Sequence, residues 1–206
     1  MRIGIFGGSL NPITNAHLTI IEAAKLQMRL DKVLVIPAGT PYMKDQETIA
    51  PAQERLNMAR NSIFGESHVE VLDIEIVREG NTYTIDTIKE LRKTYPTDTF
   101  FLILGADALS SFDQWKDFKE ILAETTIVVF ARDQVDNDTL WRQIVYLTRA
   151  YNAQVTLLDT FIPNISSTIV RQLISEGKSF KHLIPIAARH HIVANKLYGY
   201  RSECYD

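Results

Sequence analysis

The sequence predicts an α/β fold with a doubly wound (Rossmann-like) parallel sheet and a small C-terminal helical cap. Short apolar, β-branched runs alternate with helical patterns, the order of elements that builds a sheet covered by helices. The runs 33–36 and 100–104 are apolar throughout, as in strands buried on both faces of a parallel sheet. Right-handed crossovers between such strands produce the doubly wound arrangement.

Six strands and seven helices are expected. The strands are predicted at 2–6, 32–37, 69–76, 99–104, 126–131 and 155–158. The helices are predicted at 16–30, 52–64, 84–95, 118–124, 139–150, 167–176 and 185–196. The 206 residues suit a single domain over 1–206, with 165–206 as its C-terminal helical part.

Composition narrows the class of protein. The formal net charge is −3 and no basic block is present, so nucleic acid is not expected as a partner. One cysteine, Cys204, excludes a disulfide framework and indicates a reducing compartment. No apolar run approaches a membrane span, and the first residues read as a strand rather than a signal peptide. We therefore expect no membrane association and a cytoplasmic location.

The stretch Gly7-Gly8-Ser9-Leu10-Asn11-Pro12-Ile13-Thr14-Asn15-Ala16-His17 joins the first strand to the first helix. A helix start presents unpaired N–H groups and a positive dipole end, which favour phosphate. Adjacent glycines let the backbone approach a ligand closely. Thr14 and His17 are three residues apart, on one side of the first turn, where the histidine can donate to a phosphate oxygen. We predict a polyphosphate site here; the alternative is a purely structural histidine.

Two common phosphate motifs are missing. The chain lacks Gly-x-Gly-x-x-Gly, the dinucleotide fingerprint of a dehydrogenase, and Gly-Lys-Ser/Thr, the end of a P-loop. The glycine turn therefore indicates a different kind of nucleotide site.

Ligands of such sheets bind at the carboxyl ends of the strands, so residues that follow strands are candidates. Lys44 is either a mobile cation for a phosphate or the solvated end of a proline-braced loop. Asp107, in Gly105-Ala106-Asp107, either accepts from ribose hydroxyls or caps the next helix. Trp115, in a polar segment, either offers a face for stacking or belongs to the core.

A second anion site is predicted at the stretch from Asn164 to Arg171. Ser166, Ser167 and Thr168 open a helix whose first turns carry Arg171. Capping hydroxyls, free N–H groups and a guanidinium together favour an anion. The alternative is an ordinary cap with a surface arginine, but a cap needs only one hydroxyl.

The segment 73–87 ends in Thr82-Tyr83-Thr84, a polar turn that leads into a helix. This turn offers hydroxyls and N–H groups to a small acid. The alternative is that Thr84 only caps the helix.

These residues resemble those of the nicotinate-nucleotide adenylyltransferases, a family of the nucleotidyltransferase superfamily. The resemblance runs over nearly the whole length, and the order and spacing of its motifs agree. The matching pieces are Gly7-Gly8-Ser9-Leu10-Asn11-Pro12 to His17, the loop to Lys44, Arg78-x-Gly80-x-Thr82-Tyr83-Thr84-x-Asp86-Thr87, Leu104-Gly105-Ala106-Asp107, Trp115, Phe130-Ala131-Arg132 and Ile165-Ser166-Ser167-Thr168-x-x-Arg171. Many nucleotidyltransferases share the first and last pieces, whereas Tyr83-Thr84 and Trp115 are far more specific to this family.

The chain departs from the family pattern in places. Bacterial members usually have Phe-Asp-Pro-x-His where this chain has Leu10-Asn11-Pro12-Ile13-Thr14, and Met43 stands where a histidine usually precedes the lysine. The string from Asn11 to His17 is more similar to the eukaryotic nicotinamide-mononucleotide enzymes. Thr14 keeps a hydroxyl but has no titratable group for acid–base work.

The resemblance implies transfer of AMP from ATP to the 5′-phosphate of nicotinate mononucleotide, giving deamido-NAD and pyrophosphate in NAD biosynthesis. It implies catalytic roles for His17, Thr14 and Arg171. It implies an ATP site formed by Gly7, Gly8, Ser9, Leu10, Gly105, Asp107, Arg132, Ile165, Ser166 and Ser167. It implies a mononucleotide site formed by Lys44, Tyr83, Thr84 and Trp115. Mg²⁺ is expected through the ATP phosphates, without a protein metal site.

Three alternatives stay open. A dual-specificity or nicotinamide mononucleotide adenylyltransferase differs only in the pyridine substituent that it accepts. Pantetheine-phosphate and cytidylyl enzymes share the first and last motifs but leave Tyr83-Thr84 and Trp115 unexplained. A non-catalytic adenine-nucleotide sensor on the same fold is the alternative of another class. The sequence also leaves open whether copies of the chain form a homo-oligomer.

Overall fold

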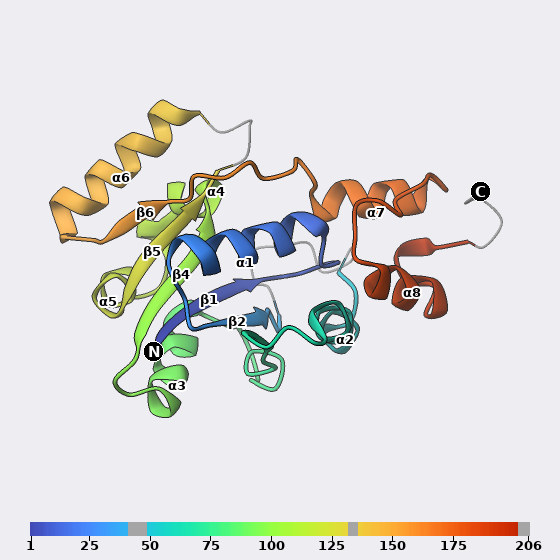
Figure 1. Cartoon of the computed structure of the whole chain (residues 1–206), viewed down its shortest axis with the longest axis horizontal. Coiled ribbons are helices and arrows are strands. Elements are labelled where there is room, and N and C mark those ends of the chain that lie inside the picture. Colours follow the sequence, from blue (N-terminus) through green and yellow to red (C-terminus); the bar gives the residue numbers. More distant parts are fainter. Residues whose placement is uncertain (41–48, 132–135, 202–206) are drawn as a thin grey trace.

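The computed structural model describes residues 1–40, 49–131 and 136–201, and it contains one six-stranded sheet (Figure 1). The strands are β1 (Arg2–Gly8), β2 (Lys32–Pro37), β3 (Val69–Val71), β4 (Thr99–Gly105), β5 (Thr125–Phe130) and β6 (Val155–Leu157). Every pairing is parallel and the strand order is β3-β2-β1-β4-β5-β6. The doubly wound parallel sheet predicted from the sequence is confirmed.

Helices cover both faces of the sheet. The α-helices are α1 (Asn15–Gln27), α2 (Ala52–Ile63), α3 (Thr84–Thr94), α4 (Ala106–Ser110), α5 (Phe118–Glu124), α6 (Asn137–Tyr151), α7 (Ser167–Ser175) and α8 (Ile186–Ala194). Within the described residues, the short 3₁₀ turns are η2 (Phe112–Gln114) and η3 (Leu197–Gly199). One buried cluster joins the sheet to α1, α2, α7 and α8, and a second joins its other face to α3, α4, α5 and α6.

Strand periodicity explains the two clusters. Successive side chains of a strand point to opposite faces. In β1, Ile3 and Ile5 therefore belong to the α3 side and Phe6 to the α1 side. Phe6 is level with Val35 of β2 and Ile103 of β4, so its face continues across the central strands.

The strand order reverses direction between β1 and β4. β1 pairs with β2 on one side and with β4 on the other, so the chain winds outward from the centre both ways. At such a switch point the loops after the two strands diverge and leave a crevice at their carboxyl ends. The segment from Gly7 to Thr14, called the glycine loop from here on, begins at this edge. The segment that follows Gly105 begins at the same edge.

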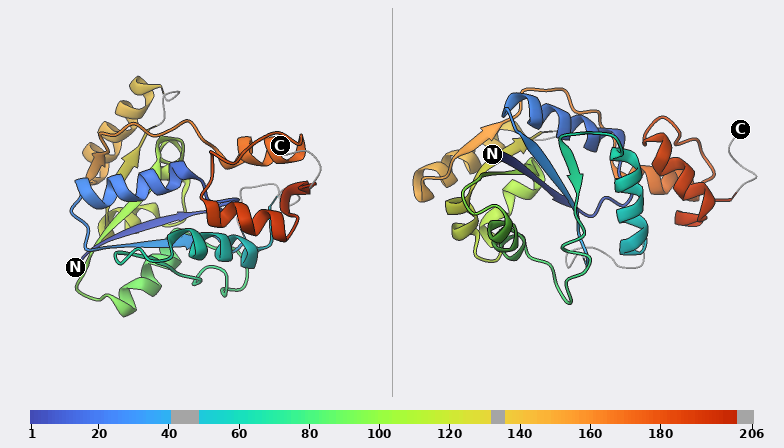
Figure 2. Two further views of the ribbon diagram at one scale, coloured as in Figure 1. Left: turned by 45° about the vertical axis from the view of Figure 1, so that its right-hand side comes forward. Right: turned by 60° about the horizontal axis from the view of Figure 1, so that its bottom comes forward.

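The helices α7 and α8 lie beyond the carboxyl edge of the sheet (Figure 2), and α8 packs against α2. Val170 and Ile174 of α7, with Ala188 and Ile192 of α8, belong to the buried cluster that contains Ile20 of α1. The C-terminal segment is thus packed into the α1-side core. It brings the Ser166–Arg171 stretch to the loop that follows β1.

Four elements differ from the sequence prediction, and one of them is η3, whose three residues are too few for a periodic pattern. The strand predicted at 69–76 ends at Val71, because residues 73–76 form a turn in which Ile76 N donates to Asp73 O. Leu72 and Ile74 still pack on the α3-side core, which explains their strand-like alternation. The short elements α4 and η2 had not been predicted, because five- and three-residue helices leave too few positions for a periodic pattern.

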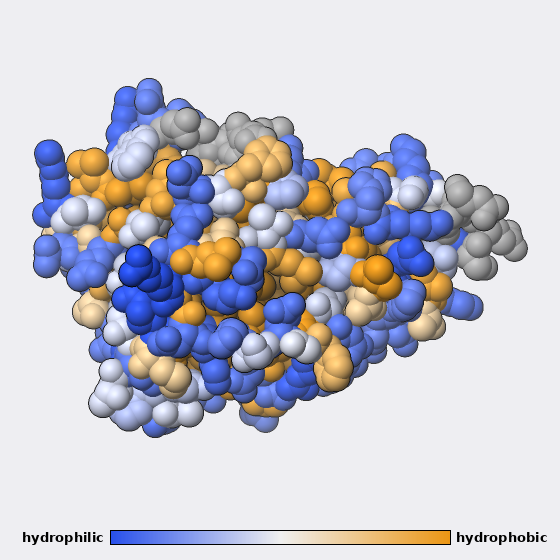
Figure 3. Space-filling model, in the orientation of Figure 1, coloured by the Kyte–Doolittle hydropathy of each residue, from blue (hydrophilic) through white to orange (hydrophobic). Residues whose placement is uncertain are grey.

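The surface seen in the orientation of Figure 1 carries apolar side chains in several separate groups among polar ones (Figure 3). None of the helices in the described ranges is both long and apolar enough to cross a membrane.

Candidate active site

The glycine loop begins at the exposed end of β1. A Cβ added at Gly8 would meet no heavy atom within 4 Å, and one at Gly7 would meet only Ile36 O, at 3.9 Å. The space beside both residues is therefore open, as a closely approaching ligand requires. The chain then turns at Leu10, which is buried and has a φ of +43°. A leucine in this region is strained, and such strain persists where surrounding contacts hold the backbone in place.

Thr14 and His17 form one unit at the start of α1. The main-chain N–H of Thr14 donates to His17 Nδ1 at 2.9 Å, and Thr14 Oγ1 lies 3.0 Å from the same nitrogen. Because Nδ1 accepts the main-chain N–H, neutral His17 carries its proton on Nε2. Thr14 is fully buried, and the contact of its hydroxyl with Nδ1 helps to orient the His17 ring. The predicted pair on one side of the first turn is present.

The stretch from Ser166 to Arg171 is fastened to the glycine loop. Ser167 Oγ donates to Pro12 O at 2.8 Å, and Arg171 Nη1 donates to Asn11 O at 2.9 Å. Ser166 caps α7 by accepting from Ile169 N at 3.1 Å. A helix cap needs only one hydroxyl, and the structure gives the others of this stretch partners of their own. These contacts bring the starts of α1 and α7, two positive dipole ends, to the same place.

Ile165 precedes the cap of α7 and fixes its approach. Its N–H donates to Pro163 O at 2.7 Å, and its side chain packs on the α1-side core. Ile165 therefore sets the main chain that leads into Ser166.

Arg55 was missed by sequence reasoning. It is 1% exposed and lies on α2. Its guanidinium donates to Ser9 O at 2.7 Å, to Gly39 O at 2.8 Å and to Ala50 O at 3.0 Å. Burial lowers its pKa. Arg55 ties the loop after β1 to the loop after β2, and a single arginine in a helical pattern gives no sign of such distant partners.

Asn11 and Tyr198 form a second unpredicted connection. Asn11 is 2% exposed, and its Oδ1 accepts from Ala50 N at 3.0 Å and from Tyr198 Oη at 2.8 Å. Burial raises the pKa of the Tyr198 phenol, while the nearby guanidinium groups of Arg171 and Arg55 act to lower it. The net shift is upward, so the hydroxyl remains a donor. Tyr198 lies in η3, almost at the end of the described chain.

After β4, Gly105 is the N-cap of α4, and Asp107 lies exposed in the first turn. The alternative that Asp107 caps the helix is thus excluded by position. A Cβ at Gly105 would clash with Asp107 Oδ1 and lie 3.3 Å from the Phe130 ring. Glycine therefore lets the carboxylate fold back over the end of β4, at the switch point.

Tyr83, Thr84 and Trp115 come close together on the α3 side of this edge. Tyr83 is the N-cap of α3 and no side chain caps this helix, so Thr84 is its first residue rather than its cap. Lys116 Nζ lies 4.5 Å from the centre of the Tyr83 ring and 3.2 Å from Asp86 Oδ2. Trp115, half-buried, packs on Phe112 with ring centres 5.1 Å apart. The two most family-specific motifs are therefore neighbours.

The remainder of the 78–87 motif braces this turn. Arg78 donates to Thr87 Oγ1 at 3.0 Å and pairs with Glu90 at 2.5 Å. Thr87 Oγ1 in turn donates to Glu75 Oε1 at 2.7 Å. Burial raises the pKa of Glu75, while the bonds from Thr87 and Thr82 act to lower it. These contacts fold the segment before Tyr83 onto α3.

Two predicted site residues, Lys44 and Arg132, lie outside the described residues. Within the described ranges, no group of three or more His, Cys, Asp or Glu side chains could hold a metal ion.

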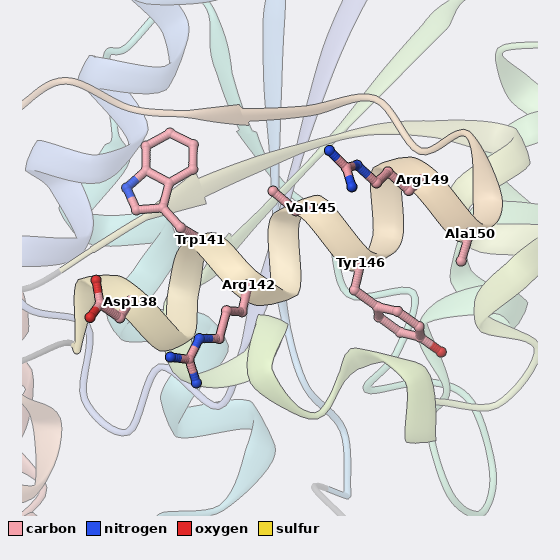
Figure 4. A pocket seen from close by; sticks show the side chains of 7 residues that line it. All are labelled: Asp138, Trp141, Arg142, Val145, Tyr146, Arg149 and Ala150. Atoms are coloured by element: carbon pink, nitrogen blue, oxygen red, sulfur yellow. The ribbon is translucent and has the colours of Figure 1, made fainter.

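A hollow of about 770 Å³ lies elsewhere, on α6 (Figure 4). It is lined by Asp138, Trp141, Arg142, Val145, Tyr146, Arg149 and Ala150. All seven residues belong to one helix, and none comes from the loops at the carboxyl edge. We therefore assign it no part in the site described above.

The class of protein follows from these contacts. At the switch point of a parallel sheet lie the glycine loop, the starts of two helices, a histidine and an arginine, which is the arrangement of a nucleotide-binding α/β protein. Comparison with known proteins agrees. The family model of cytidylyltransferase-like proteins matches residues 5–173. A probable nicotinate-nucleotide adenylyltransferase of Carboxydothermus hydrogenoformans is 36% identical over 197 residues, covering 96% of this chain and 98% of its own length. Another, of Lachnoclostridium phytofermentans, is 34% identical with the same coverage.

Solved structures agree in fold. The chain is similar to a Plasmodium falciparum nicotinic acid mononucleotide adenylyltransferase in complex with NaAD, with a TM-score of 0.80 and 20% identity over 98% of this chain and 99% of that one. The chain belongs to the cytidylyltransferase-like family and, within it, to the nicotinate-nucleotide adenylyltransferases. It is a nucleotidyltransferase.

Proposed function

We propose that the chain transfers AMP from ATP to nicotinate mononucleotide, giving deamido-NAD and pyrophosphate in NAD biosynthesis in the cytoplasm. The observation that carries this proposal is the meeting of the α1 and α7 starts at one side of the switch point, fastened by Ser167 and Arg171. Such an arrangement suits a triphosphate. The Tyr83-Thr84 turn and Trp115 form a separate polar and aromatic corner that suits a pyridine ring with an acid group.

The chemistry requires little beyond positioning. An oxygen of the mononucleotide phosphate forms a bond to the α-phosphorus of ATP, while the bond from that phosphorus to the β-bridging oxygen breaks. The electron pair of the broken bond leaves with pyrophosphate. The attacking phosphate is already an anion and needs no base, so the chain contributes alignment and charge neutralisation.

His17 donates its Nε2 proton to a phosphate oxygen as charge is redistributed. Arg171 carries five N–H donors, and those not directed at Asn11 and Thr168 serve the phosphates. Ser166 and Ser167, with the main chain of Gly7 to Leu10 and Ile165, complete the phosphate cradle. Asp107 and Gly105 receive a ribose, and Arg132 lies toward the adenine.

In the mononucleotide site, Lys44 approaches the phosphate of the mononucleotide and Trp115 stacks on the pyridine ring. The turn at Tyr83 and Thr84 receives the carboxylate of that ring. Mg²⁺ bound together with ATP would neutralise part of the charge on its phosphates. We infer that Mg²⁺ binds through the phosphate oxygens, since Mg²⁺ keeps several waters and few protein ligands in nucleotide sites. The carbonyl groups of this loop at Gly8, Ser9, Asn11 and Pro12 accept hydrogen bonds from the chain itself, so ATP rather than the protein would hold the ion.

The amide-using alternative rests on the string from Asn11 to His17. The side chain of Asn11 is buried against Ala50 and Tyr198, and His17 is held by Thr14, so neither is placed to distinguish an acid from an amide. The substituent is read instead by the turn at Tyr83, where N–H and hydroxyl donors favour a carboxylate.

The test compares the two mononucleotides side by side with ATP and Mg²⁺, following pyrophosphate release and the dinucleotide product. We expect kcat/KM for nicotinate mononucleotide to exceed that for nicotinamide mononucleotide by at least about tenfold. Equal or reversed values would identify a dual-specificity or amide-using enzyme. ATP binding without pyrophosphate release from either mononucleotide would identify a nucleotide sensor.

A further inference from the structure

The C-terminal turn η3 reaches back to the glycine loop through one side chain. Tyr198 Oη donates to Asn11 Oδ1 at 2.8 Å, although the two residues are 187 positions apart in the sequence. Asn11 is 2% exposed and Tyr198 is partly buried, so the hydrogen bond is largely shielded from solvent. The interaction therefore joins the last described element to the first loop.

Asn11 accepts hydrogen bonds from two further groups besides Tyr198. Its main-chain oxygen accepts from Arg171 Nη1 at 2.9 Å, and its Oδ1 also accepts from Ala50 N at 3.0 Å. Three residues further along, the N–H of Thr14 fixes His17 Nδ1. A displacement of Asn11 would move both the arginine and the histidine assigned to the phosphates.

We propose that Tyr198 is a positioning residue for adenylyl transfer, which acts through Asn11 to hold Arg171 and His17 in their reacting arrangement. This inference rests on the proposed function. Tyr198 touches neither substrate in this account. Burial raises the pKa of its phenol in spite of the positive charges of Arg171 and Arg55, so the hydroxyl stays a neutral donor.

Replacing Tyr198 by phenylalanine removes only the hydroxyl. Asn11 Oδ1 keeps its hydrogen bond from Ala50, so no buried acceptor is left without a partner and the fold should hold. We expect kcat to fall about two- to tenfold, the range expected from loss of one neutral hydrogen bond. We expect Tm to fall by no more than about 2–4 °C, the loss expected from one hydrogen bond in a chain of this length. We expect KM for nicotinate mononucleotide to change less than about twofold, and a loss in kcat without a change in KM is a split that a structural defect would not give.

The matched control is Tyr151→Phe, which removes a phenol whose partner is the Tyr146 hydroxyl on the α6 side. A second control is the double variant Asn11→Leu/Tyr198→Phe. If Tyr198 acts through Asn11, the double variant should be no slower than Asn11→Leu alone, whereas independent roles would multiply. Asn11→Asp retains the acceptor and should preserve the effect of Tyr198→Phe.

Hydrogen–deuterium exchange of the peptide containing residues 11–17 gives a readout independent of turnover. We expect faster exchange in Tyr198→Phe and unchanged exchange in Tyr151→Phe. An active wild type, with Tyr198→Phe equal to it in kcat and in exchange, would overturn this inference alone. A wild type without turnover would overturn the proposed function, and with it the catalytic part of the inference.

Discussion

His17 is oriented by the main chain of its own helix start. Its Nδ1 accepts from the N–H of Thr14, a donor that does not titrate, and the buried Thr14 hydroxyl lies beside the same nitrogen. The departure from the family pattern at Thr14 thus leaves the orientation of His17 intact. We infer that Thr14 holds His17 in place and does not exchange protons.

His17→Ala removes the Nε2 donor without opening the core, since His17 is only partly buried. We expect kcat to fall by about 10²–10³, by analogy with the loss of one oxyanion-hole donor. Steady-state kinetics with ATP and nicotinate mononucleotide measure the effect. His190→Ala, at an exposed histidine of α8, is the control and should keep full activity. Full turnover in His17→Ala would remove His17 from the catalytic residues.

The starts of α1 and α7 act as one element, because Arg171 and Ser167 of α7 bind the two carbonyl groups of Asn11 and Pro12. The planar fork of arginine lets one group serve a carbonyl and a phosphate at once, whereas an ammonium is a single point charge. The clamp should therefore depend on the shape of the cation and not only on its charge.

Arg171→Lys tests that dependence. We expect weaker ATP binding and slower turnover, each by about tenfold, because the charge remains but the fork is lost. Isothermal titration with ATP and a thermal unfolding curve separate affinity from folding. Arg149→Lys, on the exposed face of α6, is the matched control. Unchanged affinity and rate in Arg171→Lys would make Arg171 a structural residue only.

Local patterns predicted most elements but not the contacts between distant ones. The fully apolar runs and the glycine turn carried enough signal to place five strands and the seven longer helices to within about three residues at either end. The turn after Val71 was missed because Leu72 and Ile74 pack, partly buried, against the α3-side core although they lie outside any strand. Arg55 and Tyr198 were missed for another reason: each acts on carbonyl or amide groups far along the chain, and such contacts leave no local periodicity.

At the scale of the whole molecule, the site draws on both layers of the fold. Leu10 and Ile13 of the glycine loop are anchored in the α1-side core, whereas Tyr83 and Trp115 pack on the α3-side core. ATP and the mononucleotide would therefore be held by two separately packed layers, which lie on opposite faces of the one sheet.

The mononucleotide end of the proposed site can be observed with the two tryptophans of the chain. Trp115 lies at the proposed pyridine corner, and Trp141 is 53% exposed on α6. In Trp141→Phe, we expect nicotinate mononucleotide to quench the remaining emission, because stacking brings the pyridine against Trp115. In Trp115→Phe, the same titration should leave the emission of Trp141 nearly constant. Quenching confined to Trp141 would place the mononucleotide elsewhere.

The guanidinium of Arg55 donates to the carbonyl groups of both Gly39 and Ala50, so it holds together the two ends of the segment between them. The same guanidinium binds the carbonyl group of Ser9, so the glycine loop is held in place independently of the residues between Gly39 and Ala50. Exchange or lengthening of the stretch that carries Lys44 should therefore leave the ATP side of the enzyme in working order. That makes this stretch the natural place to graft loops from relatives when a different acceptor is wanted.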